Sequence, residues 1–205
     1  MSERDPATPR TRTTARVREL RFDAGSLALD LVATVGRRPS TPVERLGDAD
    51  RLRAWCRGVG VTLRDGEDPT ALLAALRGLR TAAHDVATAA IDGRAPRPDS
   101  VDLLNDLARV DPPAPRLLVD AQGRPAAGTA PLSAAQLLSS AARDLIALVT
   151  EPRLRERLRT CDAEVCGMVY LDPGHGRPRK WCSMERCGNN AKAARHRRRA
   201  SAPAP

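Results

Sequence analysis

Apolar residues recur at helical spacing along most of the chain. Between residues 69 and 92, leucine, valine and alanine return at intervals of about three or four positions, which predicts an amphipathic helix. Asp68 and Pro69 suit the cap and first turn of this helix, and Asp92-Gly93 suits its end. The predicted apolar positions are Leu72, Leu73, Leu76, Leu79, Ala83, Val86 and Ala90.

Two shorter helices are expected on either side of this one. The first follows Asp48 or Asp50 as its cap, places Trp55 on its inner face and ends near Gly60. The second starts near Asp99 or Ser100 after a proline-rich loop. Their inward positions are Leu52, Trp55 and Val59 in the first, and Val101, Leu104, Leu107 and Ala108 in the second.

A fourth, long helix is predicted to open between Thr129 and Pro131. Before it, residues 116–119 form a strand candidate, 121–124 a turn, and 125–129 a returning edge strand. Residues 152–158 are expected to form a short helical linker. The predicted buried stripe of the long helix is Leu132, Ala135, Leu138, Ala142, Leu145, Ile146 and Val149.

The segment from residue 20 to 35 is ambiguous. Leu27, Leu29 and Leu31 alternate as in a strand, whereas Leu27, Leu31, Val32 and Val35 also share one helix face. We favour a helix after a short extended lead-in. The fold class is then α+β: a mostly helical domain over residues 20–150 with a small β element, followed by a small cysteine module over 151–200. Residues 1–19 and 201–205 are expected to be disordered tails.

Positive charge is concentrated near the end of the chain. The net charge is +9, and residues 159–199 hold ten basic and four acidic side chains, or +6 of that total. Such a balance favours an anionic partner such as nucleic acid. No apolar run approaches the roughly 20 residues that cross a bilayer, and no signal peptide is visible. We therefore expect a cytoplasmic protein without a membrane partner, in a compartment where disulfides are rare.

Four of the five cysteines are crowded into two close pairs. Cys161 and Cys166 enclose four residues, fifteen follow, and Cys182 and Cys187 again enclose four. Two pairs separated by a loop can deliver four thiolates to one tetrahedral Zn²⁺. Zinc would supply folding energy that a module of this size lacks.

Other interpretations of these residues remain open. The four cysteines could be incidental, and His175 could replace one of them as a ligand. Cys56 lies in a separate helix and reads as a buried apolar residue. Trp181 is expected to pack beside the metal rather than to stack on a base.

A basic helix is predicted directly after the last cysteine. The sequence after Gly188 is rich in alanine, and one face combines the cations expected to meet phosphates. Arg179 and Lys180 extend this surface from the preceding loop, and asparagine can read adenine. The alternative is a solvated tail in an arginine-rich protein. The predicted DNA-binding residues are Arg179, Lys180, Asn189, Asn190, Lys192, Arg195, His196 and Arg199.

These motifs resemble the CGNR zinc-finger family. The matching features are the cysteine pairs, the turn at Asp172, Trp181-Cys182-Ser183 and Cys187-Gly188-Asn189. Asn190 departs from the arginine that gives the family its name. Residues 27–34 and 46–55 are similar to the ABATE domain that usually precedes this finger. The resemblance implies a bacterial, stress-linked transcription regulator whose larger domain senses an unidentified small molecule.

Asp30 and Thr34 stand one helical turn apart and could line a ligand pocket. We prefer a structural role for both, as caps or backbone partners. No phosphate loop, nucleophile elbow or HExxH helix is present, and His84 lies alone in its helix, so we do not expect an enzyme.

The leading hypothesis is thus a DNA-binding regulator. An RNA- or ribosome-associated zinc protein, or a small-molecule-binding protein with a purely structural finger, are the alternatives. A homodimer fits the paired half-sites that many such regulators read, although no interface is visible in the sequence.

Overall fold

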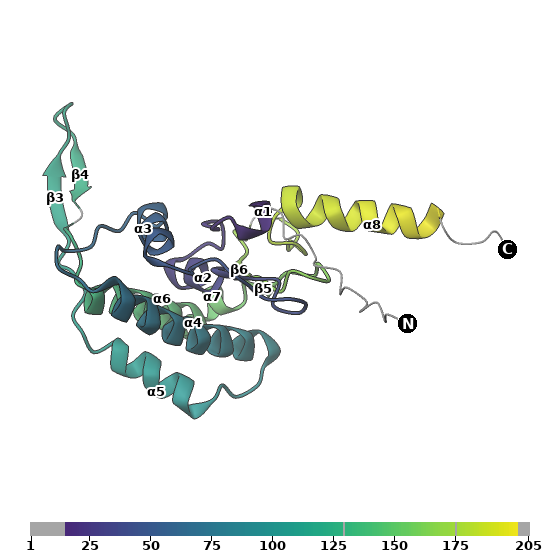
Figure 1. The fold of residues 1–205 in the computed structure, drawn as a ribbon, viewed down its shortest axis with the longest axis horizontal. Coiled ribbons are helices and arrows are strands. Elements are labelled where there is room, and N and C mark those ends of the chain that lie inside the picture. Colours follow the sequence, from purple (N-terminus) through teal and green to yellow (C-terminus); the bar gives the residue numbers. More distant parts are fainter. Residues whose placement is uncertain (1–14, 129, 175, 201–205) are drawn as a thin grey trace, which may run out of the picture.

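The computed structural model describes residues 15–128, 130–174 and 176–200, with the side chains described up to residue 194. The predicted α+β class is confirmed, because the described chain is mostly helical with three two-stranded antiparallel sheets. Figure 1 shows the helices gathered into one body, from which the hairpin β3–β4 and the helix α8 project at opposite ends.

Helix α4 (Pro69–Asp92) is the centre of the helical body and contacts α2 (Leu27–Val32), α3 (Ala49–Gly58), α5 (Pro98–Leu107) and α6 (Ala134–Thr150). Its expected boundaries are confirmed. The Asp68 side chain accepts a hydrogen bond from the Thr70 N–H, and Gly93 ends the helix in the left-handed region at φ 67°. Leu72, Leu76 and Leu79 are at most 2% exposed, so this helix supplies the middle of the core.

Helix α6 begins later than the sequence analysis expected. Ser133 and Gln136 form a capping box, so the first helical residue is Ala134 rather than one of residues 129–131. Leu132 instead pairs with Leu63 in a short bridge, and the expected core position Ala135 is exposed. The buried apolar stripe is Leu137, Leu138, Ala141, Ala142, Leu145 and Leu148.

The ambiguous segment does form a helix, α2, with Ser26 as its cap. It ends at Val32, however, because β1 (Val35–Gly36) turns away to pair with β2 (Val43–Glu44). Helix α5 likewise starts at Pro98, one residue before the expected Asp99, and its cap Arg97 makes no capping side-chain bond. Helix α3 is capped by Asp48, one of the two candidates.

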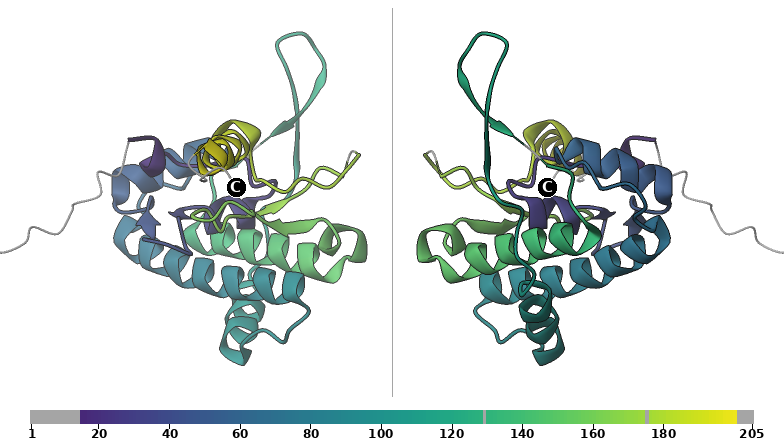
Figure 2. Two further views of the ribbon diagram at one scale, coloured as in Figure 1. Left: turned by 90° about the vertical axis from the view of Figure 1, so that its right-hand side faces the viewer. Right: turned by 90° about the vertical axis from the view of Figure 1, so that its left-hand side faces the viewer.

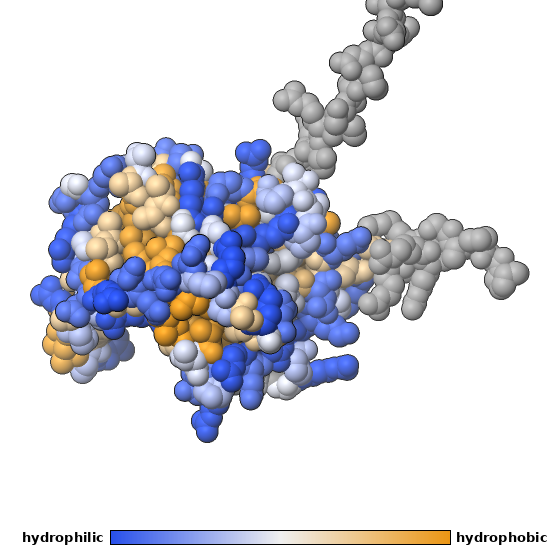
Figure 3. All heavy atoms as spheres, turned by 90° about the horizontal axis from the view of Figure 1, so that it is seen from below, coloured by the Kyte–Doolittle hydropathy of each residue, from blue (hydrophilic) through white to orange (hydrophobic). Residues whose placement is uncertain are grey.

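The predicted hairpin is present as β3 (Arg116–Val119) and β4 (Pro125–Gly128). Figure 2 shows it standing clear of the helical body in both views. Apolar side chains also remain elsewhere on the surface. On the face in Figure 3, hydrophobic areas (orange) lie between hydrophilic residues (blue), as on most folded proteins.

The C-terminal module contains a hairpin that the sequence did not reveal. After the short helix α7 (Pro152–Arg155), β5 (Leu158–Thr160) pairs with β6 (Val169–Leu171). One π-helical turn, η1 (Met184–Gly188), then leads into α8 (Asn189–Ala200), which confirms a helix after the last cysteine. Leu158, Val169 and Tyr170 are almost completely buried in the same hydrophobic cluster as the N-terminal helices. The module therefore shares a core with the larger domain.

Residues 15–19 differ from the tail expected over 1–19. Ala15–Arg18 form a helical turn, α1. Arg16 pairs with Glu185, and the Glu19 carboxylate lies 2.7 Å from the Arg186 guanidinium, so these residues are held against η1. Residues 1–14 and 201–205 lie outside the described part of the chain.

Candidate metal centre

Four cysteines meet where the hairpin β5–β6 faces η1. Cys161 follows β5, and its N–H donates to the Met168 carbonyl at 2.9 Å. Cys166 ends a tight turn in which its own N–H donates to the Ala163 carbonyl. Cys182 precedes η1 and Cys187 lies within it, so each pair is held by its own short local structure.

The geometry of the four sulfurs fits a tetrahedral metal. All four Sγ atoms lie within 4.8 Å of one another. The Sγ atoms of Cys166 and Cys182 are 3.8 Å apart, and those of Cys182 and Cys187 are 3.6 Å apart. Zinc bound at about 2.3 Å from each sulfur requires sulfur–sulfur distances of about 3.8 Å. A cluster of four cysteine sulfurs at this spacing is a closed, structural type of zinc site.

Close packing also makes the four thiols unequal. Contacts with the other three sulfurs lower the pKa of Cys182 far below its ordinary value, and the contact with Cys161 contributes most. The same kind of contact, again with Cys161 as the largest contribution, raises the pKa of Cys187. The contact with Cys166 contributes most to lowering the pKa of Cys161, to about 7. A divalent cation removes this conflict, because it favours the thiolate form of every ligand. His175, the alternative ligand, lies outside the described residues.

Gly188 lies close to the side chains of Met184 and Trp181. A Cβ atom there would lie 2.6 Å from the Met184 sulfur and 3.2 Å from the ring of Trp181. Trp181 is half-buried and packs against the hydrophobic cluster, as expected for a residue beside the metal. Cys56 is also as expected: it is buried in α3, and burial raises the pKa of its thiol to about 11.

Arg21 contacts the cluster from the N-terminal domain, which the sequence did not predict. Its guanidinium is 5% exposed, donates twice to Asp23 at 2.7 and 2.6 Å, and lies 3.7 Å from the Cys182 sulfur. Burial alone would lower the pKa of Arg21, but the hydrogen bonds and charges of Asp23 and Cys182 raise it. The only local signal was the spacing of Arg21 and Asp23, which places both side chains on one side of an extended segment.

Arg179 is part of the finger's own framework. Its guanidinium lies over the Tyr170 ring, 5.2 Å from the centroid, and 3.6 Å from the buried carboxylate of Asp172. The Asp172 carboxylate also accepts the Arg179 N–H at 2.8 Å, and this bond is the largest contribution to lowering the pKa of Asp172. Arg179 therefore stabilises the loop, and these contacts restrict the movement of its side chain towards a bound nucleic acid.

The structure describes the side chains of four of the other predicted DNA-binding residues. Lys180, Asn189, Asn190 and Lys192 are exposed. The Asn190 side chain donates to the Arg186 carbonyl at 2.6 Å. Arg195, His196 and Arg199 belong to α8, but their side chains lie outside the described part.

Asp30 and Thr34 have structural partners. Asp30 accepts a hydrogen bond from the Ala24 N–H at 3.0 Å. Thr34 is fully buried, donates to the Leu31 carbonyl and accepts from Arg80. These hydrogen bonds are of the kind expected for the structural role that was preferred from the sequence.

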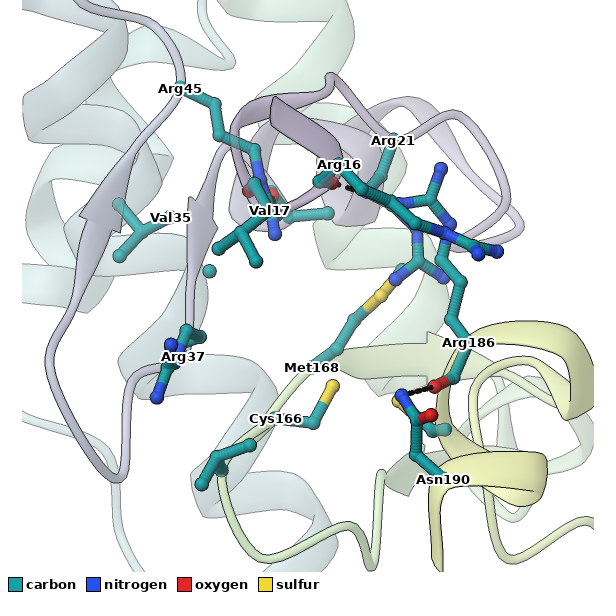
Figure 4. Close-up of a pocket in the computed structure, with 14 residues that line it drawn as sticks. Arg16, Val17, Arg21, Val35, Arg37, Arg45, Cys166, Met168, Arg186 and Asn190 are labelled. Atoms are coloured by element: carbon teal, nitrogen blue, oxygen red, sulfur yellow. Dashed lines mark hydrogen bonds between the residues drawn. The ribbon is translucent and has the colours of Figure 1, made fainter. Parts of the chain in front are cut away.

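Two cavities adjoin the cysteine cluster. The first, of about 310 Å³, lies between the N-terminal domain and the finger and is drawn in Figure 4. The second lies between the Asp162–Cys166 turn and the start of α8. None of the described helices combines the length and apolar character needed to cross a membrane.

Comparison with family models agrees with this architecture. Residues 157–200 match the CGNR zinc finger, the segment that holds the four cysteines and α8. Residues 25–152 match ABATE, whose description reads "Putative stress-induced transcription regulator". No curated protein matches the chain. Because the ABATE match spans more than half of its residues and the finger match follows directly, the chain belongs to the ABATE family and ends in a CGNR zinc finger that binds zinc.

Proposed function

We propose that this protein is a transcription regulator that binds duplex DNA through its finger and the basic helix α8. The observation that carries this is the direct continuity of the metal site with that helix. Cys187 lies in η1, and α8 begins two residues later at Asn189. Zinc would therefore hold the first turn of α8 in place and leave its cationic remainder to meet phosphates.

Helix α8 is suited to this role by composition. From Asn189 to Ala200 it contains five cations and no acidic residue, and it projects from the protein body (Figure 1). Its exposed asparagines could reach base edges, whereas lysine and arginine would supply charge. The N-terminal domain, without a recognisable catalytic motif, would act as the regulatory part.

The test measures DNA binding by the zinc-loaded full-length chain. Bound fragments are selected from genomic DNA, and their affinities are measured across a salt series. Arg195→Ala with Arg199→Ala should weaken binding and reduce the salt slope by about two, because each lost phosphate contact removes about 0.9. Arg53→Ala with Arg109→Ala removes the same charge from exposed sites elsewhere and should change little.

Two results would contradict the proposal. Selection that is unchanged in the α8 variant would show that this helix is not the reader. Preference for RNA over duplex DNA of the same sequence in direct competition would favour the RNA-associated alternative.

A further inference from the structure

We propose that the cavity between the N-terminal domain and the finger binds a small organic acid, a carboxylate with a short apolar body. The cavity borders the metal site through Cys166 and Cys187 and the start of α8 through Asn190, but the arginines that would hold the acid are not metal ligands. Binding itself does not depend on the proposed function; only regulation of DNA binding by the acid would rest on it.

The cavity is cationic on both sides. Figure 4 shows Arg37 and Arg45 on one side and Arg16, Arg21 and Arg186 on the other. The second group is already paired with carboxylates, namely with Glu185, Asp23 and Glu19 respectively. Among the described residues, Arg37 and Arg45 form no such ion pair.

Arg45 is a buried cation whose guanidinium, among the described residues, donates only to neutral groups. It is 8% exposed, and its guanidinium donates to the carbonyls of Val17 and Ala33 at 2.8 and 2.6 Å. Burial and the repulsion of Arg21 lower the pKa of Arg45. The charges of Cys166 and Asp23 act in the opposite direction, but neither forms an ion pair with Arg45. Burial of a charge without a direct ion pair is costly, and an anion in the cavity would offset that cost.

Arg37 adds two independent signs of a ligand site. Its buried Nε has no hydrogen-bond partner among the described atoms. Its backbone is in the left-handed region at φ 55°, which is unusual for a residue with a side chain. Strained backbone and unsatisfied donors are concentrated at binding sites, where a carboxylate can accept two parallel bonds from one guanidinium.

Apart from the arginines, Cys166, Cys187 and Asn190, the side chains of the wall are apolar. Val17, Val35, Val165 and Met168 line the space between the two groups of arginines. Its volume of about 310 Å³ is within the range of small-molecule sites. Charge at the rim and apolar side chains between favour an organic acid over an inorganic anion.

The experiment is calorimetry on the zinc-loaded full-length protein at constant ionic strength, without DNA. The probes are benzoate and hexanoate, with inorganic phosphate and benzyl alcohol as comparisons. We expect saturable binding of at least one carboxylate and none of the alcohol. Arg37→Met should weaken that binding by at least about tenfold, because a charged hydrogen bond is lost. Arg53→Met, at an exposed position on α3, should leave it unchanged.

A second variant separates binding from folding. Arg37→Gly relieves the left-handed backbone, so the free protein should melt no lower than the parent while binding is lost. Absence of saturation by both carboxylates, equal binding of phosphate or the alcohol, or unchanged binding in Arg37→Met would each overturn the proposal.

An independent observation concerns the hairpin β3–β4, and from it we infer that β3 pairs with β3 of a second copy of the chain. Leu117, Leu118 and Val119 are 77%, 50% and 70% exposed. An isolated two-stranded hairpin is marginally stable, and an open apolar edge invites a further strand. The edge of β4 is blocked by Pro125, which has no N–H to donate, whereas β3 contains no proline.

The register of this pairing follows from the hairpin. The Asp120 N–H donates to the Arg124 carbonyl, so the backbone hydrogen-bonding groups of Asp120 point towards β4. These groups alternate in direction along an antiparallel strand, so those of residues 118 and 116 also point towards β4, whereas those of 117 and 119 point outward. Antiparallel self-pairing then places Leu117 opposite Val119 of the second copy, and Leu118 opposite its own equivalent. At each end of the paired strands, Arg116 lies opposite Asp120 of the second copy, so opposite charges meet. Within its own chain, Asp120 also pairs with Arg124 in the turn.

Cysteine cross-linking tests this register. In the zinc-loaded full-length protein, Leu118→Cys should give a disulfide-linked dimer with a thiol oxidant, because the two residues face each other. Leu117→Cys is the matched control and should not give this dimer, because residue 117 and its equivalent in the second copy are diagonal neighbours about 7–8 Å apart. A monomer by analytical ultracentrifugation, or a dimer that survives Leu117→Lys with Val119→Lys, would overturn the inference.

Discussion

The guanidinium of Arg21 lies 3.7 Å from the sulfur of Cys182, although 161 positions separate them in the sequence. Arg21 is in turn fixed by two hydrogen bonds to Asp23. The contact connects the N-terminal domain directly to a metal ligand. Groups that donate to a ligand sulfur tune how tightly the metal is held.

Arg21→Met should therefore weaken zinc binding by about 10- to 100-fold, as is typical when such an outer partner is removed. Competition with a coloured chelator measures the change. Arg21→Lys should reduce zinc affinity less than Arg21→Met does, because lysine keeps a positively charged hydrogen-bond donor. Arg53→Met, from an exposed pair on α3, is the control for loss of one arginine. Equal zinc affinity in Arg21→Met and the parent would show that the contact has no influence.

Removal of zinc should destabilise the whole chain and not the finger alone, because both parts share one core. A chelator should lower the melting temperature by at least about 10 °C, since a structural zinc supplies several kcal/mol and each is worth roughly 2–4 °C at this size. Calorimetry with metal analysis measures both effects. Cys182→Ala should lose the metal, whereas Cys56→Ala should keep one zinc per chain. Two separate melting transitions in the zinc-loaded protein would contradict the shared core.

Asn190 is exposed at the second position of α8, where the family carries arginine. Under the proposed function, Asn190→Arg should raise affinity for duplex DNA and increase the salt slope by about 0.9, the contribution of one phosphate contact. Ala147→Arg, on the exposed side of α6, adds the same charge away from the finger. If both variants change DNA affinity equally, the gain comes from net charge and not from position.

His84 should contribute to loss of stability in acid. Burial, helped by repulsion from Arg38, lowers the pKa of His84 from 6.5 to about 4. Between pH 6.5 and about 4, His84 is protonated in the unfolded chain but stays neutral in the folded chain. The contribution of neutral His84 to the free energy of unfolding is therefore fully present above pH 6.5 and is lost as the pH falls towards 4. His84→Gln should make the melting temperature less dependent on pH across this window. An unchanged pH profile would show that His84 titrates normally.

Local chemistry made much of the fold predictable. Asp68 with Pro69 marks the start of α4, and the two close pairs Cys161/Cys166 and Cys182/Cys187 favoured the metal site that the four sulfurs form. The start of α6 was misplaced because a better local signal, the Ser133 capping box, was overlooked.

Contacts between distant segments were not predictable in the same way. Arg21 near Cys182 and the pairing of β5 with β6 depend on how the two domains pack, and strands of three residues leave no periodic signal. Arg179 was predicted as a DNA contact from its charge. Its contacts with Tyr170 and Asp172 become visible only when the loop is folded.

The hydrogen bond from the Leu171 N–H to the Ala24 carbonyl has a practical consequence for shortened forms of the protein. It attaches the stretch just before residue 25 to the edge of the finger's hairpin, although the ABATE match starts only at that residue. A chain cut at this match boundary would keep every cysteine yet lose Arg21. A finger expressed by itself would expose Leu158 and Tyr170 to water.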